Sequence, residues 1–80
     1  MKDTINSILE QAESARCWDS LDAMLRLKAI SAICRTYLKF EFSPALAFIW
    51  ITADDEKFEL AYRLRSVVQV CNDYLNSLPK

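Results

Sequence analysis

The densest group of chemically active side chains in the sequence is the acidic run Asp54, Asp55 and Glu56. Neighbouring carboxylates can divide the roles of acid and base in catalysis when their surroundings separate their pKa values. This run follows Thr52, a residue type that caps helices, and acids in the first turn of a helix are stabilised by its dipole. We therefore interpret the run as the start of a helix and not as a catalytic pair.

Nucleophilic and metal-dependent chemistry find little support in the residue types present. The chain contains three cysteines, Cys17, Cys34 and Cys71, and no histidine. Histidine is a frequent general base and the commonest metal ligand, and no two of these cysteines have the short spacing that zinc sites use. Each cysteine falls in or beside an apolar helical pattern, so we expect structural thiols in a reducing compartment. We accordingly expect no enzymatic activity, no cofactor and no metal.

Charge and hydropathy limit the partners further. The net charge of −1 gives no general attraction to nucleic acid or to an anionic membrane. The longest uninterrupted apolar run, 45–51, is far too short to span a bilayer, and the N-terminal segment lacks the apolar centre of a signal peptide. We therefore expect a cytoplasmic protein that does not associate with membranes.

One local basic stripe qualifies this view. Lys28, Arg35 and Lys39 are spaced i, i+7 and i+11, so they project from one side of a helix. Such a stripe could contact phosphates or an acidic protein surface. No aromatic residue is interleaved with it to stack on bases, so we favour a solvated helix face. A nucleic-acid-associated regulator is kept as the alternative function.

Aromatic residues are the stronger indication of a binding surface. Several crowd the middle of the chain, while Phe58 and Tyr62 lie one turn apart on the otherwise polar side of the last predicted helix. Leu60 and Leu64 define the inward side of that helix, opposite the aromatic pair. Phe58 and Tyr62 therefore either cover the third predicted helix or anchor a partner, as large exposed aromatics often do. The candidate partner-binding residues are Phe58, Tyr62, Arg65, Phe42 and Trp50.

Apolar residues spaced three and four apart recur along the whole chain, and this period is typical of helices. Residues that cap helices precede the periodic segments, and Pro79 follows the last of them. The predicted helices, each with its expected N-cap, cover 4–16 (Asp3), 20–40 (Asp19), 44–51 (Ser43) and 53–78 (Thr52).

The segment 37–52 admits a second interpretation. Its aromatic and β-branched residues favour strands, so a β-hairpin turning at Ser43 and Pro44 would give an α+β fold. We prefer the helix, because an isolated two-stranded ribbon is marginally stable and the segment has no glycine or asparagine for a tight turn.

The sequence thus predicts an all-α fold, a compact bundle of three long helices and one short helix in a single domain spanning 1–80. Apolar residues make up 52% of the chain. A domain this small buries only about 60–65% of the surface that its unfolded chain exposes, so apolar surface should remain outside. We therefore expect a homodimer or a protein partner, and a non-catalytic adaptor, chaperone-like binder or inhibitor as the function.

Overall fold

The computed structural model describes residues 1–15 and 21–78. Every regular element in these two ranges is a helix, which confirms the all-α prediction, and no hairpin forms over 37–52. The cap predicted at Asp19 and the thiol of Cys17 lie outside the described residues. The helices are α1 (Lys2–Glu13), α2 (Leu21–Leu38), α3 (Pro44–Asp54) and α4 (Leu60–Ser77).

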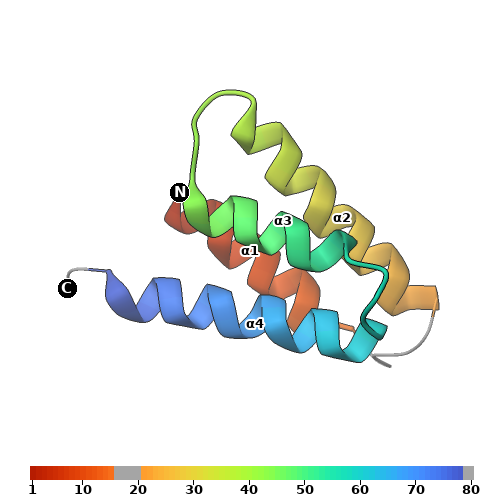
Figure 1. Ribbon diagram of the computed structural model, residues 1–80. Helices are drawn as coiled ribbons and strands as arrows, with labels where there is room; N and C mark the ends of the chain where they lie inside the picture. Colours follow the sequence, from red (N-terminus) through yellow and green to blue (C-terminus); the bar gives the residue numbers. More distant parts are fainter. Residues whose placement is uncertain (16–20, 79–80) are drawn as a thin grey trace.

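The α2 and α4 helices form the centre of the bundle, because each of them packs against the other and against both α1 and α3. The α1 helix contacts α2 and α4, and the α3 helix also contacts α2 and α4. In Figure 1, α3 and α4 lie side by side and run in opposite directions, joined by a short connection at one end of the bundle. One flank of α3 therefore faces α2, another faces α4, and its remaining side faces outward.

The core is built from all four helices, at the positions where the apolar spacing places it. The buried residues of α1, for example, are Ile5, Ile8 and Ala12, which follow the i, i+3, i+7 rule. The largest fully buried side chains of the bundle are Ile5, Ile8, Ile30, Cys34, Leu46, Ile49, Leu64, Val67 and Cys71.

The start of α3 agrees with the predicted cap. Ser43 has an extended backbone, and its hydroxyl accepts a hydrogen bond from the backbone N–H of Leu46 at 3.3 Å. Pro44 occupies the first helical position, where the missing N–H is not needed. This cap fixes the point at which the chain turns from the α2–α3 connection into α3.

We expect Ser43→Ala to lower the free energy of unfolding by about 1 kcal/mol, because it leaves the N–H of Leu46 without its partner. Urea denaturation measures the change. Ser7→Ala, an exposed substitution inside α1, is the matched control and should be neutral or slightly stabilising, since alanine favours helices. Equal stabilities for the two variants would contradict the cap.

The predicted start of the last helix is wrong. The sequence predicts a helix from residue 53, whereas α3 continues to Asp54 and α4 begins only at Leu60. The acidic run therefore stands at the C-terminal end of α3 and in the connection that follows, not in the first turn of a helix. Carboxylates are disfavoured at a helix C-terminus, so this end needs other stabilising contacts.

Two side chains supply those contacts. The guanidinium of Arg63 donates from Nη1 to the carbonyl of Ala53 at 3.2 Å and from Nε to the carbonyl of Phe58 at 3.0 Å. The indole Nε1 of Trp50 donates to Oδ2 of Asp54 at 2.8 Å, one turn further along the same helix. Arg63 thereby joins the end of α3, the connection and α4 into one unit.

The other helix ends differ by a few residues from their predicted positions. The α1 helix begins at Lys2, so Asp3 lies in its first turn instead of capping it, and the helix ends at Glu13. The α2 helix ends at Leu38, two residues before its predicted end. Phe40 and Phe42 therefore lie in the connection between α2 and α3, where both are largely exposed.

Candidate functional site

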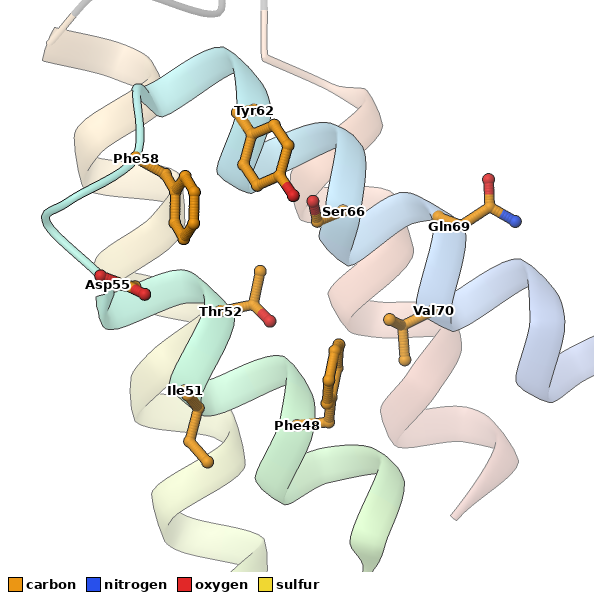
Figure 2. A pocket seen from close by; sticks show the side chains of 9 residues that line it. All are labelled: Phe48, Ile51, Thr52, Asp55, Phe58, Tyr62, Ser66, Gln69 and Val70. Carbon is orange, nitrogen blue, oxygen red and sulfur yellow. The ribbon is translucent and has the colours of Figure 1, made fainter.

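A hollow of about 460 Å³ lies between the outer sides of α3 and α4, and we call it the α3–α4 groove. Figure 2 shows Phe48 at one end of this groove and the rings of Phe58 and Tyr62 at the other, with Thr52 between them. Its main lining residues are Phe48, Ile51, Thr52, Asp55, Phe58, Tyr62 and Val70.

The aromatic pair predicted from the sequence forms one wall of the groove. The rings of Phe58 and Tyr62 are stacked, with centroids 4.6 Å apart and an angle of 26° between their planes. Phe58 belongs to the connection and not to the helix as predicted, while Tyr62 lies in the first turn of α4. Both stay nearly half exposed, at 44% and 47%. The stacking holds the connection against α4 and fixes two large apolar surfaces toward solvent.

The α3 helix forms the other wall, and Thr52 is its only polar residue before Asp54. It contains no charged residue before Asp54. Leu46, Ile49 and Ala53 of α3 are buried in the core. Phe48 and Ile51, on its outer side, are 56% and 67% exposed. A helix with apolar residues all round is normally buried on all sides, and this one is open on its outer side.

Phe48 and Ile51 were not among the residues selected from the sequence. The signal that could have found them is the uncharged stretch 44–53 itself. In a bundle of four helices each helix keeps a side that faces outward, so a helix with almost no polar residues must leave apolar side chains on its surface.

Three other predicted residues are distributed around the molecule. Arg65 is exposed on α4, three residues after Tyr62, so it lies beside the groove. Trp50 is partly buried against the core on the flank of α3 away from Thr52. Phe42 lies in the α2–α3 connection, where it lines a separate hollow together with Tyr37 and Tyr74. The structure thus brings Phe58 and Tyr62 together in the groove and leaves Arg65, Trp50 and Phe42 outside its lining.

The basic stripe lies on a different surface. Lys28, Arg35 and Lys39 are exposed on α2 and the turn that follows it, and none of them lines the groove. The neighbouring Arg26 points elsewhere, since it pairs with Asp22 at 3.5 Å and donates to Oε1 of Gln11 at 3.1 Å. The stripe and the groove are therefore separate features that can be altered independently.

The described cysteines belong to the core. Cys34 of α2 and Cys71 of α4 are fully buried. Burial raises the pKa of the Cys34 thiol to about 11 and that of the Cys71 thiol to about 12. The negative charge of Asp54 raises the pKa of Cys34 further. Both thiols are therefore protonated near neutral pH, which is the opposite of what a nucleophilic cysteine requires.

We expect Cys34 and Cys71 to react with a bulky thiol reagent only when the protein unfolds. A pKa raised to about 11 leaves roughly 100-fold less thiolate at pH 8 than an ordinary cysteine has, and burial also blocks access. Mass spectrometry of a Cys17→Ser variant follows the labelling of these two thiols. Labelling at the rate of a free thiol, in a protein that circular dichroism shows to be folded, would contradict their burial.

Comparison with known protein families, with curated proteins and with solved structures finds no match for this chain. Within residues 1–15 and 21–78, no helix has both the length and the apolar character needed to cross a bilayer. In the same ranges, no three cysteine or acidic side chains gather as a set that could hold a metal ion.

Proposed function

We propose that this protein is a small non-catalytic binding module, an adaptor, chaperone-like binder or inhibitor, that contacts a partner protein through the α3–α4 groove. The observation that carries the proposal is the open outer side of α3. Phe48 and Ile51 are more than half exposed on a helix with no charge before Asp54. Each square ångström of apolar surface removed from water contributes about 25 cal/mol, so covering this side favours association.

The size of the exposed surface supports a binding role. A large aromatic side chain presents roughly 150–250 Å², so Phe48, Phe58 and Tyr62, each about half exposed, leave roughly 75–125 Å² apiece open. Ile51 adds to that area. Exposed apolar patches of about 300–600 Å² are the largest on most monomers and are often functional.

The composition of the groove also suits an interface. Aromatic residues dominate the energetic centres of protein interfaces, where truncating one side chain costs about 2 kcal/mol or more. The stacked pair is held in place before binding, so little conformational freedom is lost when a partner covers it. Arg65, at the edge, would tune specificity and the rate of encounter more than affinity.

The proposal is tested by comparing the proteins that purify with two variants in the cell of origin. We expect Phe58→Ala with Tyr62→Ala to lose the partner, while Lys28→Glu with Arg35→Glu retains it. Circular dichroism checks that both variants fold. Retention by the aromatic variant and loss by the charge-reversal variant would instead support the basic stripe and a nucleic-acid-associated regulator. Steep weakening of that binding with salt would identify phosphate contacts.

A further inference from the structure

The proposed binding function leaves open what kind of segment occupies the groove. We propose that the occupant is an amphipathic helix of a partner protein, with lysine or arginine at the end that meets the α3–α4 connection. This inference rests on the proposed function and adds to it the shape and the charge of the partner.

The shape of the groove suits a helix. It runs between two neighbouring helices of opposite direction, and a third helix can pack between such a pair with apolar residues at i, i+3 or i+4, and i+7. Figure 2 shows the small side chain of Thr52 between Phe48 at one end of the groove and the stacked pair at the other. One bulky apolar side chain of the partner can therefore enter over Thr52, between the aromatic rings at the two ends.

The charge of the groove is uneven along its length. The segment 54–59, which is the last residue of α3 and the connection, carries four carboxylates and one lysine, a net charge of −3. Asp55 lines the groove, whereas Asp54 accepts a hydrogen bond from Trp50 and Glu56 lines a separate hollow. The other end, around Phe48 and Val70, has no charged lining residue. The guanidinium of Arg63 donates to backbone carbonyls and not to these carboxylates. A partner helix with a basic end therefore complements the acidic end of the groove.

A second copy of this chain fits the groove less well. An interface with two-fold symmetry pairs the same surface on both copies. None of the residues that line the groove is basic, and Arg65 lies beside the groove, outside its lining. A symmetric dimer that paired the two grooves would therefore bury the apolar side chains without placing a basic lining residue against Asp55 of either copy. The charge pattern favours a different protein over a homodimer.

The test uses two synthetic amphipathic helical peptides, each about four turns long, with the same leucine stripe. One peptide carries lysines at both ends and the other carries glutamates, so the orientation in the groove does not matter. Fluorescence anisotropy at low salt should show tighter binding of the lysine peptide, because its charge complements the acidic end of the groove. The expected difference in affinity is only about tenfold, because exposed ion pairs are individually weak. Raising the salt should reduce that ratio, since exposed charges are screened.

Variants separate the contribution of the acidic end of the groove from that of its apolar surface. Asp55→Asn with Glu59→Gln should bring the ratio of the two affinities close to one. Glu10→Gln with Glu13→Gln removes the same charge from exposed positions on α1 and should leave the ratio unchanged. Phe48→Ala should weaken the binding of both peptides, because it removes the aromatic ring at one end of the groove.

Three results would overturn the inference. If both peptides bind equally and Phe48→Ala weakens both, the groove binds helices but its acidic end does not select them. If neither peptide binds while a purified partner still depends on Phe58 and Tyr62, the binding function stands and the occupant is not such a helix. If sedimentation shows a dimer that Phe48→Ala dissociates, the occupant is a second copy.

Discussion

Replacing Leu64 by alanine is expected to lower the free energy of unfolding by about 2–5 kcal/mol. Leu64 lies on α4 and is 0% exposed, so its truncation leaves a cavity among the four helices. The total stability of a chain of 80 residues is about 4–12 kcal/mol, so this one change removes much of it. Urea denaturation followed by circular dichroism measures the loss.

Leu25→Ala is the matched control for that experiment. Leu25 is on the neighbouring helix α2 and is more than half exposed, so the same chemical change removes little buried surface. We expect a loss below about 0.5 kcal/mol. Comparable losses for the two variants would mean that the inward side of α4 is assigned wrongly.

Placing two carboxylates on the outer side of α3 should abolish binding without unfolding the protein. We expect Phe48→Glu with Ile51→Glu to weaken the affinity for the proposed partner by at least about 100-fold, because both carboxylates would be buried in an apolar interface. Both side chains are more than half exposed in the free protein, so its stability should change little. Isothermal titration calorimetry with the purified partner measures the affinity.

Phe40→Glu controls for the added charge. Phe40 is also largely exposed, but it lies in the α2–α3 connection and does not line the α3–α4 groove. This variant should bind the partner as well as the unmodified protein does. If Phe40→Glu abolishes binding and the double variant on α3 retains it, the interface lies at the other end of the bundle.

The core could be predicted from the sequence because, in a helix with one polar side, the spacing of the apolar residues identifies the side that faces the core. Cys34 and Cys71 are examples, since each sits in a row of apolar residues three and four apart and each is fully buried. The Ser43 cap was predictable for a similar local reason, because the capping residue and its proline are adjacent in the chain.

The boundary between α3 and α4 could not be predicted in the same way. The acidic run satisfies the local rules for a helix start, yet it stands at a helix end, where Arg63 donates to the carbonyl of Ala53. That contact joins residues ten positions apart, one on α3 and one on α4. Local spacing carries no information about it.

The candidate site was predicted in part. Phe58 and Tyr62 stood out because they interrupt a polar side of the last helix, and their rings are in contact. Phe48 and Ile51 did not stand out, because apolar residues lie on every side of α3 and its pattern gives no direction. Trp50 is a candidate because of its residue type. It lies on the flank of α3 away from the groove, where its indole donates a hydrogen bond to Asp54.

Site-specific photo-crosslinking in the cell of origin tests most directly whether the α3–α4 groove contacts a partner protein. A photoreactive phenylalanine analogue replaces Phe48 in one variant and Phe40 in the other, two exposed positions of the same residue type. We predict a protein adduct from position 48 and none from position 40. An adduct from position 40, next to Lys39 of the basic stripe, with none from position 48 would contradict the groove as the binding surface.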